Sequence, residues 1–353
     1  MPNKMSNERP RILRSGCLRL GIFALLGLTA CDDNLVAYLT KQGFRQGSLL
    51  LSARPIEDIL KDPAIDARTE KFLRLAQDVV KYAHVEVGMS VGRSYQSYAR
   101  LDRPWVTQIV MAAPRDKLES YLFRYPIFGG LPYKGFFDES DAIGLEKRLE
   151  AEGLDVYRRE VEAFSTTGWL PDPLLSSMLS EEARLIELLF HELTHSNFYF
   201  QGEADFNEAF ASWMGHRVAL EYIAKKPSLD GDKLRARIQK IHAFQVRLAG
   251  VVKEITARGR EIYAQGTPAD LDSRRKSYFD WIQQRLRETD LRNLESRPWN
   301  NALILSLSTY YELVPAIEAY AEREKLSPRD YLARVKARGP GIIPEILKAA
   351  RSG

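Results

Sequence analysis

Residues 181–200 read EEARLIELLFHELTHSNFYF and contain no glycine or proline. The acidic pair at 181 and 182 favours the positive end of a helix, and Ser180 before it is a suitable N-cap. Apolar residues recur at spacings of three and four, which places them on one helical face: Leu185, Leu188, Leu189 and Leu193. The segment is therefore predicted to be a helix with a buried apolar stripe.

Two of the five histidines of the chain, His191 and His195, stand four positions apart in this helix, with Glu192 after the first. Positions i and i+4 lie one above the other on a helix face, so both imidazoles can reach one ion. Zinc in such a frame lowers the pKa of a bound water, and the glutamate serves as its base. The frame predicts a zinc site with Glu192 as the catalytic base. The alternative is a pair of structural histidines with an exposed glutamate.

A catalytic zinc ion usually takes three protein ligands and keeps a fourth position for water. The candidates for the third ligand are Glu203, Asp205, Glu208 and His216. Glu203 and Asp205 fall in a turn, and Asp205 is suited to cap a second helix predicted over 206–225. Glu208 stands in the first turn of that helix, where it can face the histidines or act as a capping group. We expect Glu208 to be the third ligand and His216 to be a surface or packing residue.

The frame His191–His195, followed by Asn207-Glu208-Ala209-Phe210-Ala211, resembles the gluzincin metallopeptidases, whose third ligand is a glutamate on a following helix. Further stretches resemble a bacterial family of putative aminopeptidase lipoproteins. They are SARPI at 52–56, YKGFFDE at 133–139, AFSTTGW at 163–169, DPLL at 172–175, NNA at 300–302, Tyr310 and VPA at 314–316. The resemblance extends over nearly all of residues 31–353. It implies that His191, His195 and Glu208 bind zinc and that Glu192 is catalytic.

Tyr310 lies in one of these stretches, and its hydroxyl can donate a hydrogen bond to the oxyanion that develops during peptide hydrolysis. A tyrosine in the core or at an interface is the alternative. Twelve residues separate His195 from Glu208, fewer than in thermolysin-like enzymes, so the turn between the helices must be tight. The sequence has no Gly-x-Met-Glu-Asn motif, with which the large aminopeptidases hold a free amino terminus. Aminopeptidase activity is therefore implied by the family resemblance alone.

The first 30 residues are predicted to be a lipoprotein signal peptide. Five basic residues precede an apolar run over 20–30, and this run is too short to span a bilayer. The run ends in Leu28-Thr29-Ala30-Cys31, which resembles a bacterial lipobox and would make Cys31 the acylated first residue. A plain signal peptide or a short uncleaved anchor is the alternative. Asp32 resembles an inner-membrane retention signal, so we expect a lipid-anchored protein that faces the periplasm.

Removal of this leader changes the composition of the chain. Cys17 is lost and Cys31 is acylated, so histidine and carboxylate remain as the strong metal ligands. The leader holds five Lys/Arg and one Glu, which leaves 46 basic and 46 acidic residues in 31–353. A neutral mature chain gives no electrostatic case for nucleic-acid binding.

Residues 31–353 are predicted to form one metallopeptidase domain of the α+β class, mostly helical, with a small sheet beside the zinc helix. Its N-terminal part, 31–179, carries the strands, and the part from 180 to 353 is helical. Residues 54–101 are expected to be helical, most clearly over 69–87. The remaining expectations are strands at 105–112, 121–128 and 156–164, a helix at 139–152 and a long helical hairpin within 231–293.

Several of these segments have alternative functions. The strand at 156–165 can be a sheet edge that binds substrate as an added strand, or an interior core strand. Trp169 and a turn at Gly129-Gly130 are expected near a cleft. The hairpin within 231–293 is predicted to be a solvated helical pair, with a lid or a docking arm as alternatives.

Together these features predict a lipid-anchored zinc metallopeptidase that hydrolyses peptide bonds in the bacterial cell envelope. The resemblance makes an aminopeptidase the first expectation. An endopeptidase of envelope proteins is one alternative. A non-catalytic lipoprotein that binds a peptide or a partner protein is the other.

Overall fold

The computed structural model describes residues 35–125, 129–166, 169–226 and 229–349. The chain divides into two compact units, Met1–Leu49 and Leu50–Gly353. The described part of the first unit belongs to helix α2 (Leu35–Ser52), which runs on into the start of the second. The predicted leader, the lipobox and Cys31 lie outside the described residues and stay predictions. None of the helices in the described ranges combines the length and the apolar character needed to cross a membrane.

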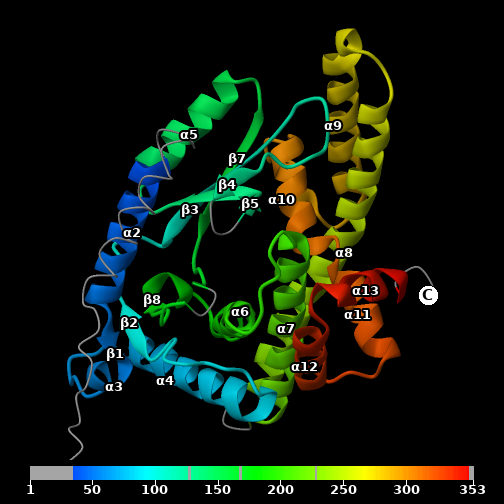
Figure 1. Cartoon of the computed structure of the whole chain (residues 1–353). Coiled ribbons are helices and arrows are strands. Elements are labelled where there is room, and N and C mark those ends of the chain that lie inside the picture. The colour runs from blue at the N-terminus through cyan, green and yellow to red at the C-terminus, as the bar shows by residue number, and fades with distance from the viewer. Residues whose placement is uncertain (1–34, 126–128, 167–168, 227–228, 350–353) are drawn as a thin grey trace, which may run out of the picture. The chain divides into compact units, whose positions relative to one another are not determined.

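The second unit confirms the predicted fold class, α+β and mostly helical (Figure 1). Its first part contains β1 (Arg54–Pro55), α3 (Ile56–Ile59), α4 (Ala67–Tyr82), β2 (Ser97–Ala99), β3 (Thr107–Ala113), β4 (Phe123–Tyr125), β5 (Gly129–Leu131), β6 (Tyr133–Phe136), α5 (Glu139–Ala151), β7 (Asp155–Val161) and β8 (Leu174–Leu175). The rest is helical, as predicted: α6 (Glu182–His195), α7 (Ala204–Ala224), α8 (Gly231–Ala264), α9 (Leu271–Glu288), α10 (Asn301–Tyr311), α11 (Val314–Arg323), α12 (Pro328–Arg338) and α13 (Ile343–Ala349).

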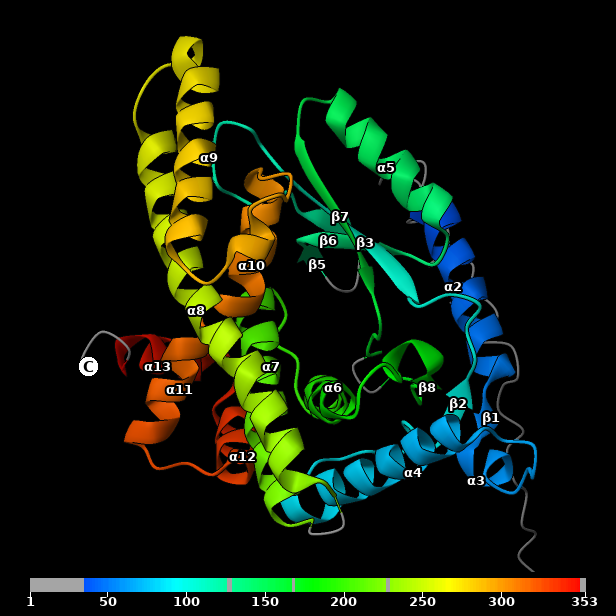
Figure 2. The same ribbon diagram turned by 180° about the vertical axis from the view of Figure 1, so that it is seen from behind.

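The strands form three small sheets instead of the one predicted, in the orders β1-β2-β8, β6-β3-β7 and β4-β5. In the second sheet both neighbours run antiparallel to β3, which is buried along most of its length. Helices α5 and α10 pack against this sheet, and Figure 2 shows the strands between them. Among the described strands β7 lies at the edge of its sheet, which decides between the two alternatives for this segment; binding of substrate along this edge stays a prediction.

Two expectations about short segments are wrong. Residues 54–101 are not helical throughout, because Arg54 and Pro55 pair with Tyr98 and Ser97 to join β1 to β2. Gly129 and Gly130 belong to strand β5 and do not form a turn. The main helix of the region is confirmed: α4 begins where the Asp66 carboxylate accepts a hydrogen bond of 2.8 Å from the Thr69 amide, and a π-helical turn extends it to Val87.

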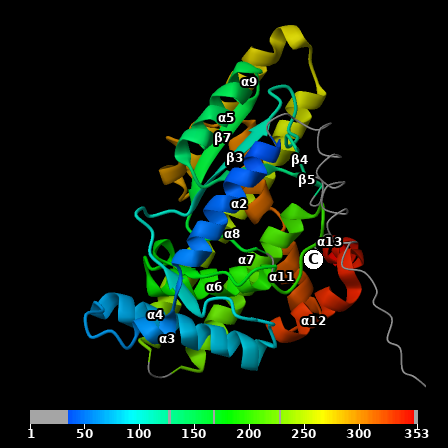
Figure 3. The same cartoon turned by 60° about the vertical axis from the view of Figure 1, so that its left-hand side comes forward.

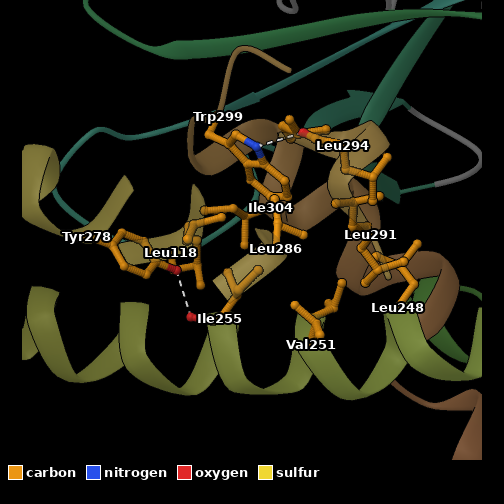
Figure 4. Packing of buried hydrophobic residues seen from close by; sticks show 14 residues of the cluster. Leu118, Leu248, Val251, Ile255, Tyr278, Leu286, Leu291, Leu294, Trp299 and Ile304 are labelled. Carbon is orange, nitrogen blue, oxygen red and sulfur yellow. Dashed lines mark hydrogen bonds between the residues drawn. The ribbon is translucent and has the colours of Figure 1, made fainter. Parts of the chain in front are cut away.

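The predicted helical hairpin is confirmed as α8 and α9, but one face of it is buried. Apolar residues of both helices pack against α10 and the segment before it in the cluster of Figure 4, with Val251, Ile255, Leu286 and Ile304 among its members. The Tyr278 hydroxyl donates a hydrogen bond of 2.7 Å to the Ile255 carbonyl within this cluster. The hairpin is therefore attached to α10, the helix that carries Tyr310, and is more than a solvated helical pair.

Candidate metal centre

Helix α6, which carries both histidines, is shorter than predicted. Its N-cap is Glu181 instead of Ser180, and the Glu181 carboxylate accepts hydrogen bonds of 2.6 and 2.9 Å from Arg237. At the other end the Asn197 side chain donates to the Leu193 carbonyl at 2.8 Å and to the Ser90 carbonyl at 3.0 Å. This side chain takes the carbonyl that another helical turn would have used, so the helix stops at His195 instead of Phe200.

The loop after α6 is closed by the buried side chain of Asn207. Its Oδ1 accepts from the Phe200 amide at 3.0 Å, and its Nδ2 donates to the Phe200 carbonyl at 2.8 Å. Helix α7 begins at Ala204, two residues earlier than predicted, with Glu203 at its N-cap and Asp205 in its first turn. Asp205 is thus not the capping residue. The closed loop explains how so short a connection brings the next residue, Glu208, back to α6. Figure 3 shows helices α6 and α7 next to each other.

The structure brings His191, His195 and Glu208 together. The two Nε2 atoms lie 3.1 Å apart, and Glu208 Oε2 lies 3.5 Å from that of His191 and 3.7 Å from that of His195. Tetrahedral ligands at zinc-bond lengths of roughly 2.0–2.2 Å are about 3.3–3.6 Å from one another, so the spacing fits one zinc-sized ion. Within the described ranges, no other three His, Cys, Asp or Glu residues bring their donor atoms within 4.8 Å of one another.

The charges and the burial of these three residues are suited to binding a cation. Burial raises the pKa of Glu208, but His195 and His191 lower it by more, so the carboxylate stays charged. Burial lowers the pKa of His195, but Glu208 outweighs this effect and the pKa is raised. Glu192 is 7 % exposed, and burial raises its pKa. The alternative of structural histidines beside an exposed glutamate is therefore wrong about this residue.

Three tyrosines from different elements lie within electrostatic reach of the centre. Burial raises the pKa of Tyr133, Tyr199 and Tyr310, and the charge of Glu208 raises it further. Their hydroxyls are therefore protonated at neutral pH and can donate hydrogen bonds. Tyr310 was expected here. Tyr133 was not, although it begins one of the stretches that carry the family resemblance.

Arg159 on β7 was not expected at the site either. The centre of its guanidinium lies 4.9 Å from the centroid of the Tyr310 ring, which is a cation–π contact. Burial lowers the pKa of Arg159, but Tyr310 and Glu208 are among the groups that raise it by more. Nothing in the local sequence distinguishes Arg159 from Arg158, so only the placement of β7 could have found it.

A buried carboxyl, that of Asp172, lies within electrostatic reach of Glu192. It accepts a hydrogen bond of 3.0 Å from the Thr166 amide, and its backbone carbonyl accepts one of 2.7 Å from Tyr95. Burial raises the pKa of Asp172 to about 6, and the charge of Glu192 contributes to the increase. A pocket of about 230 Å³ lies beside this loop, and its lining includes Trp169 and Ser196. Trp169 therefore lines a pocket that reaches the residue after His195, in line with its expected place near a cleft.

His216 belongs to a separate cluster. Its ring stacks on that of His242 with centroids 3.7 Å apart, and its Nδ1 lies 3.5 Å from Glu187 Oε1. The pKa of His242 is lowered to about 4, mainly by burial and in part by the charge of His216. His216 is thus a packing residue between helices and does not belong to the group of His191, His195 and Glu208. Glu203 and Asp205, the other candidates, are exposed.

A comparison with protein families matches residues 37–339 to the family described as "Putative aminopeptidase". The chain belongs to this family. Searches of curated proteins and of solved structures found no match. The matched range includes β7, both helices of the metal centre and α10, so family membership covers every residue described above for the site. Membership in the aminopeptidase family supports hydrolysis of peptide bonds as the general activity.

Proposed function

We propose that this chain is a zinc-dependent metallopeptidase anchored by lipid in the bacterial cell envelope. One observation carries the proposal: the donor atoms of His191, His195 and Glu208 lie within 4.8 Å of one another, next to the buried Glu192. Two imidazoles and one carboxylate are a known ligand set of catalytic zinc, and they leave a position for water. Family membership supports peptides as the substrate.

His191, His195 and Glu208 would hold the ion, which supplies a Lewis acid for the scissile carbonyl and lowers the pKa of water. Glu192 takes the proton of the attacking water and passes it to the leaving amine. Its raised pKa suits it to both steps, since a group that exchanges a proton works best with a pKa near the working pH. Tyr310 donates a hydrogen bond from its neutral hydroxyl to the developing oxyanion.

The proposed location rests on the sequence of the leader. The lipobox-like segment before Cys31 supports acylation of that residue, and Asp32 supports retention at the inner membrane, with the catalytic unit facing the periplasm. Peptides or proteins of the cell envelope are then the accessible substrates. The test is fractionation of cells that produce the full chain. Wild type is expected with the membranes and Cys31→Ser outside them, and equal distribution of the two would overturn the lipid anchor.

The activity is tested by metal analysis together with sequencing of cleavage products. Wild type is expected to contain one zinc per chain and to cleave a peptide library, whereas Glu192→Gln keeps the zinc and loses turnover by roughly 10²- to 10⁴-fold. The control is Glu182→Gln, a change on the same helix at a residue paired with Lys71 on the surface. Retained cleavage in Glu192→Gln would refute the assignment of the base.

The products distinguish the alternatives. Release of single N-terminal residues indicates an aminopeptidase, and internal cuts indicate an endopeptidase. Purified protein without stoichiometric zinc and without cleavage supports the non-catalytic lipoprotein that binds a peptide or a partner.

A further inference from the structure

Two adjacent arginines on the edge strand β7 have different surroundings. Successive side chains of a strand point to opposite faces of the sheet. Arg158 points to α5, where its Nε lies 2.7 Å from Glu146 Oε2 and its Nη1 lies 3.6 Å from Glu139 Oε1. The charge of Arg158 is thus neutralised within the fold.

Arg159 points to the other face, toward α10 and the metal centre. Its guanidinium lies over the ring of Tyr310, and its side chain is half-buried. Across the described segments, no Asp or Glu oxygen lies within 4.0 Å of this guanidinium, and it donates no hydrogen bond to a protein acceptor. Partial burial of a cation costs free energy unless an anion or hydrogen-bond acceptors compensate it. The fold gives Arg158 direct ion pairs, whereas Arg159 has only the Tyr310 ring and the more distant charge of Glu208.

A count of the charges in the zinc-loaded site shows that one positive charge has no anionic partner. The two positive charges of a zinc ion would be balanced by the carboxylates of Glu208 and Glu192, with both histidines neutral. The positive charge of Arg159 would then have no negative charge to balance it. A guanidinium presents parallel N–H donors that match the two oxygens of a carboxylate, and a cation–π contact holds it in place without using those donors.

We propose that Arg159 binds a carboxylate of the peptide substrate, close to the bond that is cleaved. The proposal rests on the peptidase function proposed above. It narrows the substrates to peptides with an anionic group near that bond, either the terminal carboxylate of a short peptide or the side chain of Asp or Glu. A neutral internal stretch of a long polypeptide would leave the guanidinium without a direct anionic partner.

The test compares matched peptides with the zinc-loaded enzyme. Each short peptide is supplied as the free acid and as the C-terminal amide, and a second set exchanges Glu for Gln at each position around the cut. Wild type is expected to prefer the anionic member of one pair by roughly 10- to 100-fold in kcat/KM, mainly through a lower KM, because a charge-assisted hydrogen bond is lost in the neutral member. The set that shows the preference identifies the source of the carboxylate.

Variants then assign the preference to one residue. In Arg159→Met the ratio of kcat/KM between the anionic and neutral peptides is expected to fall to about one, and Arg159→Lys is expected to keep part of it. Arg158→Met is the matched control and should keep the wild-type ratio. A ratio measured on one preparation does not depend on the folded fraction, so partial unfolding of a variant does not obscure the result. Binding of the same pairs to Glu192→Gln, measured by calorimetry, gives a readout without turnover.

The inference is overturned if wild type cleaves both members of every pair equally, or if Arg159→Met keeps the preference. In either case cleavage by wild type, and its loss in Glu192→Gln, would leave the proposed peptidase function intact. If wild type loaded with zinc cleaves no peptide of either set, the proposed function fails and the inference fails with it.

Discussion

Gly215 of α7 lies directly against the backbone of Glu187 in α6. A Cβ atom at this glycine would stand 2.8 Å from the Glu187 carbonyl oxygen and 3.4 Å from Cβ of His191. Contacts below 3.0 Å force a shift of one of the atoms, and a helix backbone gives way less easily than a side chain. The close approach of the two helices, on which the meeting of Glu208 with the histidines depends, therefore requires glycine at this position.

Gly215→Ala is accordingly expected to destabilise the fold by about 1–3 kcal/mol through overpacking and to weaken metal binding. Urea unfolding of the metal-free protein and zinc titration measure the two effects. Gly250→Ala is the control, because a Cβ at this helical glycine of α8 meets nothing within 4 Å. The control is expected to be neutral or stabilised by up to about 1 kcal/mol. Equal behaviour of the two variants would show that the helices can separate without consequence.

Glu208→Gln is expected to reduce zinc affinity strongly, because it replaces a charged ligand by a neutral amide. The loss should exceed the roughly 10- to 100-fold that removal of an outer partner of a ligand costs. Competition with a chromogenic chelator measures it. Glu203→Gln, a change of the exposed glutamate at the N-cap of α7, should leave the affinity unchanged. If the two variants bind zinc alike, the third ligand is another group.

Tyr310→Phe is expected to lower kcat by roughly 10²- to 10³-fold, with zinc content unchanged, since it removes one donor to the oxyanion. Steady-state kinetics on one cleaved peptide provides the measurement. The neighbouring Tyr311 packs against the hydrophobic cluster of Figure 4, so Tyr311→Phe is the matched control and should keep most of the activity. An unchanged kcat in Tyr310→Phe would show that this hydroxyl is not a donor to the oxyanion.

The buried carboxyl of Asp172 predicts a pH dependence of stability. Burial raises its pKa from 3.8 to about 6, so the folded state holds a proton that the unfolded state has released. The free energy of unfolding should therefore fall as the pH rises from about 4 to 6, by up to about 3 kcal/mol. Asp172→Asn should flatten this part of the curve, measured by urea unfolding of the metal-free protein.

The control for this dependence is Asp66, whose pKa is lowered by its hydrogen bonds with Thr69. Its stabilising effect is present above the ordinary pKa and is lost as the pH falls, so Asp66→Asn should change the opposite end of the curve. If the decline between pH 4 and 6 persists unchanged in Asp172→Asn, another group causes it.

Elements with a strong local pattern could be predicted from the sequence. The helices α4 and α5, the strands β3 and β7 and the hairpin α8–α9 all appear near their expected bounds, because apolar periodicity reports burial directly. The sheet β1-β2-β8 was not predicted. Its strands pair Arg54 with Tyr98 and Tyr98 with Leu174, residues far apart in the chain, and each strand is too short to show a pattern.

The same division holds in the candidate metal centre. His191, Glu192 and His195 follow from spacing within one helix, and Glu208 follows from its place near the start of the next. The end of α6 could not be predicted, because Asn197 is held by Ser90 from a distant loop. Tyr133 and Arg159 reach the site through the sheet, and the sequence gives no local sign of which strand residues face it.

The pairing of β7 with β3 determines which arginine side chain reaches the candidate site. Ile109 stands opposite Arg159, and Val110 stands opposite Arg158. Slippage of β7 by one residue would exchange the two guanidinium groups between the faces of the sheet while leaving the amino-acid composition of the site unchanged. The glutamates of α5 would then hold the wrong arginine. The ion pairs of Glu139 and Glu146 with Arg158 thus favour the observed register of an edge strand over a register shifted by one residue.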